Sequence, residues 1–231
     1  MNVDTGRKPQ ARWSGAPHPP RASLAEEAYT RLEEMIVTLE LRPGSVLSEA
    51  ELSRKIRIGR TPMREALQRL QAHRLVTTLP RRGVVISEIN IVDFLSLLET
   101  RRVLDRLVAT KAARRASPEQ RNALEKIAGA MVAAAGRGDM TEYMRLDTAF
   151  DRLLEEASRS AYALQASVPL HAQCRRFWYL YRHNGDLLKS AGLHAAMMRA
   201  VARGNEGEAG DAADALVDYM EAFARTALDL T

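Results

Sequence analysis

Two carboxylates and one imidazole are the side chains of this sequence best placed to do chemistry together. Asp147 and Asp151 stand at i and i+4 in an expected helix, one residue around from its apolar stripe, so both carboxylates should follow one boundary of the core. His194 falls within the apolar stripe of a later helix, and its imidazole should face the interior. Such groups can hold a cation or contact a polar ligand, although an inward histidine is more often a hydrogen-bonded core residue.

Arg101 and Asp105 interrupt the apolar stripe of another expected helix. Because they lie one turn apart, they form either an intrahelical ion pair or part of a ligand pocket. Both interpretations stay open. The single cysteine, Cys174, is expected to be a packed thiol, and one cysteine excludes a disulfide framework or a cysteine-built zinc module.

A different chemistry is expected where arginines open a short helix. Arg60 and Arg64 lie at its basic start, with Thr61 as the expected cap and Pro62 at the first helical position. An arginine fork matches the O6 and N7 atoms of guanine. This helix therefore has side chains suited to reading DNA.

Two further helices are expected before it. Apolar residues at helical spacing predict a helix over residues 24–40, which Pro43 stops. Ser48 followed by Glu51 predicts a capping box at the start of a second, short helix.

A hairpin is expected after the third helix. Two runs rich in β-branched residues, 75–80 and 84–89, flank Arg81, Arg82 and Gly83, which predicts a basic hairpin tip. Three helices followed by such a hairpin form a winged helix-turn-helix, whose third helix enters the major groove of DNA.

The rest of the chain is expected to be helical. Turn signals divide it into six segments, 89–116, 118–135, 140–158, 161–183, 186–203 and 205–230. Residues 1–23 combine prolines and basic groups with few large apolar side chains, which predicts a disordered basic arm. The fold class is mainly α: an N-terminal winged helix-turn-helix over residues 24–90 and a C-terminal all-α antiparallel helical bundle over residues 91–231.

The N-terminal pattern closely resembles the GntR family of bacterial transcription regulators. The resemblance rests on the order and spacing of Leu-Arg-Pro-Gly-Ser-Val-Leu-Ser-Glu at 41–49, Arg-Thr-Pro-Met-Arg-Glu-Ala-Leu at 60–67 and the Arg-Gly of the wing. Two departures are visible: Gly59 replaces a usual serine, and Arg74 replaces a usual helix-ending glycine. Arg74 is then expected to take a slightly strained left-handed backbone.

The resemblance implies the DNA contacts residue by residue. Arg60 and Arg64 contact bases or flanking phosphates, Thr61 contacts phosphate, and Arg82 with Gly83 enters the minor groove. Arg81, also at the wing tip, is added as a DNA contact; the alternative is a solvated surface group.

The helical part resembles the six-helix branch of the FadR-like C-terminal domain (FCD). Members of that class are dimers that bind small carboxylates, often around a metal held by an aspartate and three histidines. The resemblance implies metal ligands at Asp147, Asp151 and His194, and an effector contact at Arg101.

The metal positions depart from the family pattern. Asp151 and Leu216 stand where the family has histidines. A divalent ion (Mn, Mg, Zn or Ni) is still expected, and an oxygen-rich ligand set would favour Mn or Mg over Zn. The alternative is that metal binding is lost and an apolar or cationic effector occupies a remodelled pocket.

Charge and composition agree with a regulator. Of 231 residues, 46% are hydrophobic, enough to bury a core. Residues 1–90 hold 15 Lys or Arg against 10 Asp or Glu, whereas residues 91–231 hold 19 of each, which fits a nucleic-acid-binding module joined to a neutral partner. No secretion signal or membrane span is indicated.

We therefore expect a cytoplasmic homodimeric transcription regulator, repressor or activator, that binds operator DNA and a small-molecule effector, such as a carboxylate metabolite, and is not an enzyme. Two alternatives remain: a metal-dependent enzyme using Asp147, Asp151 and His194, or an architectural DNA-binding protein without an effector.

Overall fold

The computed structural model describes residues 23–80 and 82–228. Most of the expected basic arm, residues 1–22, and the expected DNA contact Arg81 lie outside this range. Ser23, placed in the arm by the sequence, instead caps the first helix, because its side chain accepts a hydrogen bond from the backbone N–H of Glu26 at 3.1 Å.

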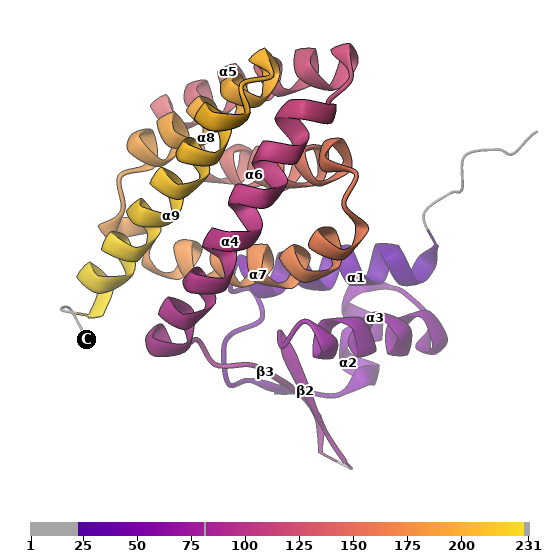
Figure 1. Cartoon of the computed structure of the whole chain (residues 1–231). Coiled ribbons are helices and arrows are strands. Elements are labelled where there is room, and N and C mark those ends of the chain that lie inside the picture. Colours follow the sequence, from indigo (N-terminus) through magenta and orange to yellow (C-terminus); the bar gives the residue numbers. More distant parts are fainter. Residues whose placement is uncertain (1–22, 81, 229–231) are drawn as a thin grey trace, which may run out of the picture.

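The N-terminal part has the three expected helices and the expected hairpin, which forms a small antiparallel sheet with a third strand. In Figure 1 the two longer strands project as a hairpin from the base of the molecule. The elements are α1 (Leu24–Val37), β1 (Val46–Leu47), α2 (Glu49–Ile56), α3 (Arg60–Ala72), β2 (Val76–Leu79) and β3 (Gly83–Ile86). The strand order is β1-β3-β2. The sequence did not predict β1, a two-residue strand that pairs Val46 with Val85 of β3.

Local capping explains where the helices begin. The capping box of Ser48 and Glu51 is present at α2, as predicted. The predicted start of α3 was wrong, because Gly59 is the N-cap and Thr61 lies inside the first turn. The backbone N–H of Met63 donates to the carbonyl of Gly59 at 3.1 Å, and Pro62 is tolerated because first-turn N–H groups have no helical partner.

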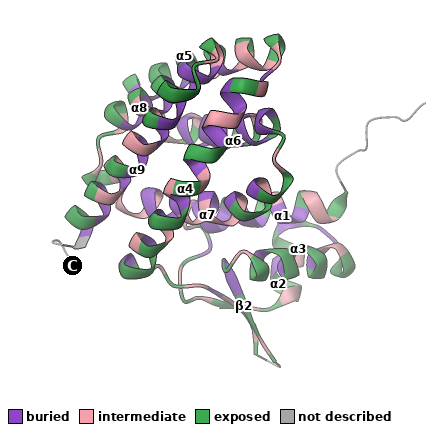
Figure 2. Ribbon diagram, in the orientation of Figure 1, coloured by how far each residue is buried: buried purple, intermediate pink, exposed green. Residues whose placement is uncertain are grey.

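The C-terminal part is a helical bundle whose expected segments are confirmed to within about three residues at each end. Its helices are α4 (Ile91–Arg115), α5 (Pro118–Gly136), α6 (Met140–Ser158), α7 (Ala161–Tyr181), α8 (Leu187–Arg203) and α9 (Glu206–Leu228), with a short 3-10 turn η1 (Arg182–Asn184) before α8. Figure 2 shows buried residues on the faces that the helices turn inward. Among the described helices, none has the length and apolar character needed to cross a membrane.

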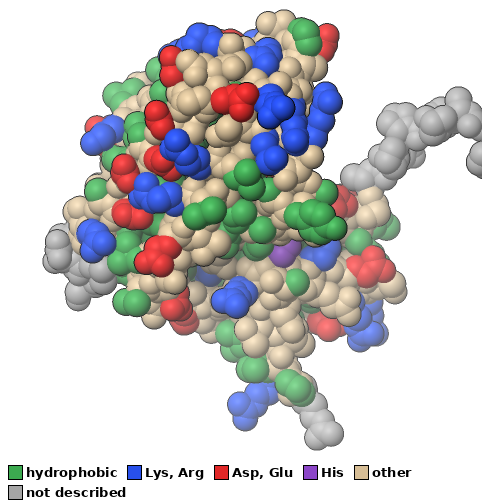
Figure 3. Space-filling view, in the orientation of Figure 1, with side chains coloured by type: hydrophobic (Ala, Val, Ile, Leu, Met, Phe, Trp, Pro, Cys, Tyr) green, Lys and Arg blue, Asp and Glu red, His purple; other side chains and the backbone are tan. Residues whose placement is uncertain are grey.

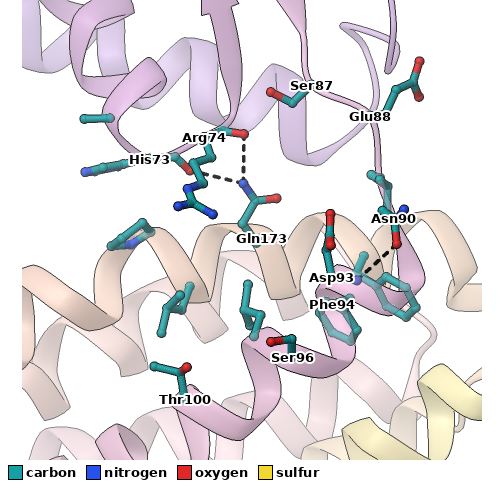
Figure 4. A pocket seen from close by; sticks show the side chains of 16 residues that line it. His73, Arg74, Ser87, Glu88, Asn90, Asp93, Phe94, Ser96, Thr100 and Gln173 are labelled. Atoms are coloured by element: carbon teal, nitrogen blue, oxygen red, sulfur yellow. Dashed lines mark hydrogen bonds between the residues drawn. The ribbon is translucent and has the colours of Figure 1, made fainter.

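Helix α7 takes part in both regions. Ala172 is fully buried in the hydrophobic cluster of the N-terminal part, whereas Cys174 and Phe177 belong to the cluster of the bundle. The side-chain amide of Gln173 donates to the backbone carbonyls of His73 and Arg74 at 3.1 and 3.2 Å. Figure 4 shows these bonds crossing a cleft of about 630 Å³ between the two regions.

Candidate functional site

Four of the predicted DNA-contacting residues lie at the surface of the N-terminal part. Arg60, Thr61, Arg64 and Arg82 are all exposed, and Figure 3 shows basic side chains beside the tip of the projecting hairpin. The Nε atom of Arg64 donates to Glu49 Oε2 at 2.9 Å, and its side chain is 67% exposed. A surface pair of this kind is worth little, so Arg64 can exchange its carboxylate for a DNA acceptor.

Gly83 at the wing requires glycine for two reasons. Its φ is +108°, in the region that L side chains rarely adopt. A Cβ at this position would lie 2.5 Å from the backbone oxygen of Leu47. Arg74 also has the expected left-handed backbone, with φ 58°.

A buried cluster of charged side chains fills the centre of the bundle. The structure brings the predicted residues Arg101, Asp147, Asp151 and His194 together around one cavity of about 30 Å³, room for about one water molecule. Asp105, His171 and Glu155 are also buried beside it. We call the eight residues Arg101, Asp105, Asp147, Asp151, Glu155, His171, Arg175 and His194 the buried charge cluster.

One half of the cluster is centred on His171 of α7. Its Nε2 atom lies 3.0 Å from Asp105 Oδ1, and its Nδ1 atom lies 3.1 Å from Asp151 Oδ2 without the alignment of a hydrogen bond. Asp105 also accepts a hydrogen bond from Arg101 Nε at 2.7 Å. Arg101 and Asp105 thus form the intrahelical ion pair, and Arg101 lines the cavity as well.

The other half joins His194 and Arg175 to the two aspartates of α6. His194 Nε2 lies 3.1 Å from Asp147 Oδ1, and its Nδ1 lies 2.8 Å from the backbone carbonyl of Ser190. Arg175 Nη1 donates to Asp151 Oδ2 at 2.6 Å and lies 3.6 Å from Asp147 Oδ2. A guanidinium therefore stands between the two carboxylates.

The shifts in pKa follow from these contacts. Burial by itself favours neutral aspartic acid, but His171, Arg175 and Arg101 outweigh it and lower the pKa of Asp151 to about 2. Burial opposes charge on His171, yet Asp151 and Asp105 raise its pKa well above the usual value. The pKa of His194 is also raised, because Asp147 outweighs burial. Burial raises the pKa of Glu155.

Comparison with known proteins agrees with both regions. The sequence model for "Bacterial regulatory proteins, gntR family" matches residues 24–86, and the model for the FCD domain matches residues 96–219. The chain belongs to the GntR family, with an FCD domain. This confirms the resemblance drawn from the motifs, and the helical bundle with its N-terminal winged helix-turn-helix is the architecture of that family.

Relatives of this GntR protein are transcription regulators. It is 30% identical over 136 residues to an HTH-type transcriptional regulator of Agrobacterium vitis, covering 58% of this chain and 80% of that protein. It is 27% identical over 161 residues to the HTH-type transcriptional repressor RspR of Escherichia coli, covering 70% and 71%. In fold it is similar to the E. coli protein McbR/YncC, with a TM-score of 0.78, 15% identity and coverage of 90% and 100%.

The cluster of this GntR protein does not fit a divalent metal. Among the described residues, no group of three or more His, Cys, Asp or Glu side chains is arranged to hold one. Both ring nitrogens of His194 face acceptor oxygens, which suits a protonated imidazole, whereas a metal ligand must be unprotonated. Leu216 is fully buried and supplies no ligand, and Arg175 already places a positive charge at the carboxylates.

The sequence reasoning missed His171 and Arg175. A signal was present: these residues lie at i and i+4 in α7, a helix that contains no acidic residue. Buried basic groups need anionic partners, so the partners had to come from other helices. The sequence indicated only packing for this helix, with Cys174 as a packed thiol.

Proposed function

We propose that this protein is a transcription regulator whose affinity for operator DNA is controlled by a small organic anion bound in the FCD domain, without a metal. The observation that carries the proposal is the position of α7. Its face toward α6 bears His171 and Arg175 of the buried charge cluster, and its other face bears Ala172 and Gln173, which contact the DNA-binding part. A change in the cluster therefore acts on the helix that supports the winged helix-turn-helix.

The proposed DNA contacts are Arg60, Thr61, Arg64, Arg82 and Gly83, with Arg81 on the sequence argument. The exposed arginines at the start of α3 support base reading in the major groove. The wing supports phosphate or minor-groove contact. A protein of this kind acts where bacterial DNA lies, so we place it in the cytoplasm, and the cluster, with its acids and bases paired to one another, offers no argument for catalysis.

An anion is favoured as effector by the guanidinium groups at the cavity. Arg101 and Arg175 line it together with both imidazoles of the cluster. Arg101 Nη1 donates to the sulfur of Met220 at 3.2 Å, a weak acceptor that a carboxylate would readily replace. A cationic effector would meet four basic side chains here, against the two carboxylates of Asp147 and Asp151.

Dimerisation is proposed through α4. Val103 and Leu107 are 69% and 41% exposed on this helix, and Val92 is 68% exposed nearer its start. Figure 3 shows hydrophobic side chains gathered on the face that includes α4. An exposed apolar stripe on a long helix supports contact with a second copy, and a two-fold dimer would read a pseudo-palindromic operator.

Selection of bound sequences from random duplex DNA by the full chain tests the function. We expect an enriched pseudo-palindromic motif whose affinity falls when a small organic anion is added. Enrichment of no motif, with equal binding to all duplexes, would favour the architectural alternative instead.

A further inference from the structure

A second, larger hollow adjoins the buried charge cluster. It has a volume of about 400 Å³, within the range of small-molecule sites. Helix α7 packs against both α6 and α1 of the DNA-binding part, and residues of all three helices line the groove. Met144 and Arg175 line both this groove and the inner cavity of about 30 Å³. The groove and the inner cavity therefore lie next to each other and share these two side chains.

The lining combines apolar surface with basic groups. Val37, Met144, Ala149 and Tyr179 supply apolar surface, and Arg145, Arg152 and Arg175 supply positive charge against Glu33 and Glu34. Arg145 is tied to Glu142 at 2.9 Å. Arg175 is the buried one, with a side chain only 10% exposed.

The two ends of the Arg175 guanidinium are held unequally. Nη1 donates to Asp151 at 2.6 Å, whereas Nη2 lies 4.0 Å from Glu33 Oε1. No described residue accepts a hydrogen bond from Nη2. A carboxylate or similar anion can approach Nη2 as a charge-assisted acceptor, at a distance that Glu33 does not reach.

Glu33 connects this position to the recognition helix. It is 9% exposed on α1, and Tyr29 Oη donates to its Oε1 at 2.9 Å. The same Tyr29 oxygen lies 2.9 Å from Nδ1 of His73, the C-cap of α3. An anion at Arg175 would face the Glu33 carboxylate and repel it, and the repulsion would act on α1 and on the end of α3.

We infer that the groove between α1 and α6 binds a small organic anion with an apolar body, whose anionic group pairs with Arg175 in place of Glu33. This inference rests on the proposed function, because it names the place and chemical class of the effector. The apolar body lies along Val37, Met144 and Tyr179. The anion thereby contacts the DNA-binding part directly, and its binding weakens the hold of α7 on α1.

Calorimetric titration of the full chain tests this with benzoate and octanoate as probes, and with benzylamine and octylamine as size-matched cations. We expect at least one carboxylate to bind and neither amine. Ala149→Trp fills the groove from an exposed position on α6 without touching the cluster, and should weaken carboxylate binding by about tenfold or more. Glu156→Trp is the matched control, because Glu156 is exposed on the same helix and does not line the groove; it should bind as wild type does.

Glu33→Gln tests the effect of charge alone, because it removes the carboxylate without filling the groove. Removing the competing carboxylate should tighten carboxylate binding by about threefold to tenfold, and in the variant the anion should release operator DNA less strongly. If Ala149→Trp fails to fold, Thr141→Trp fills the groove from another exposed position on α6.

Two results would overturn the inference: no carboxylate probe binds wild type, or both groove-filling variants bind it as wild type does. Operator binding measured without any probe decides the proposed function separately, so the two failures can be told apart.

Discussion

The two charged regions of this protein use the same chemical groups with opposite consequences. On the DNA-binding face, the Arg64–Glu49 pair is 67% and 37% exposed. In the buried charge cluster, the Arg101–Asp105 pair is also made through the arginine Nε atom, but both of its side chains are only 7% exposed. Water competes with the first pair and screens it, whereas the second pair was desolvated on folding. Exposure therefore leaves Arg64 available to a partner, whereas burial commits the Nε atom of Arg101 to Asp105 within the fold.

Removing one carboxylate from the cluster gives the largest expected effect. Asp151→Ala leaves Arg175 and His171 without their shared anion, and should lower the free energy of unfolding by about 3 to 5 kcal/mol. Glu142→Ala removes the partner of the exposed Arg145. It should change the free energy of unfolding by less than about 0.5 kcal/mol. Urea denaturation of both variants measures the difference. Equal losses of stability would mean that burial does not distinguish the two ion pairs.

Acid should have the second-largest effect, because it protonates a carboxylate of the buried charge cluster. The pKa of Asp151 in the folded chain is about 2, below its unfolded value of about 3.9. Ionised Asp151 then contributes about 2 to 3 kcal/mol to the free energy of unfolding above pH 4, and this contribution is lost as the pH falls toward 2. Melting curves across this range should show a steeper loss in wild type than in Asp151→Asn, and parallel losses would remove Asp151 from the explanation.

Arg64→Ala tests the exposed side. It should weaken binding to the selected operator by about 1 to 3 kcal/mol and leave non-specific binding much less affected. Because the pair with Glu49 is exposed, thermal stability should hardly change. Competition binding with operator and random duplexes gives the answer, and an equal loss on both would assign Arg64 to phosphate contact.

Chelation should have the smallest effect. With Arg175 between the two aspartates and both imidazoles facing acceptors, EDTA should shift the melting temperature by about 1 °C or less. Elemental analysis of the purified protein is the companion measurement. A stoichiometric divalent metal, lost with a fall in melting temperature, would restore the metal site expected from the family pattern.

The sequence predicted the parts of the fold that depend on neighbouring residues. Capping at Ser48, the wing and the bundle helices all rest on contacts within a few positions of the chain. It also placed Asp147, Asp151 and His194 on one interior surface. It missed Arg175, because the contact with Asp151 joins α7 to α6 and only packing decides which helices meet.

The short strand β1 was missed for a related reason. Two residues carry no periodic pattern, and Val46 and Leu47 become a strand only because β3 lies beside them. The start of α3 was misplaced because Thr61 has good capping chemistry, whereas Gly59 caps the helix without a side chain.

The shared helix α7 limits how this protein can be recombined. Ala172 is completely buried in the DNA-binding core, and Arg176 of the same helix, also fully buried, donates to the backbone carbonyl of Ser87 just before α4. A chimera that joins this winged helix-turn-helix to another FCD domain at the α4 boundary would lose both contacts. For such a hybrid to keep effector control of DNA binding, the residues at positions 172, 173 and 176 should have to be transferred to the matching helix of the other FCD domain.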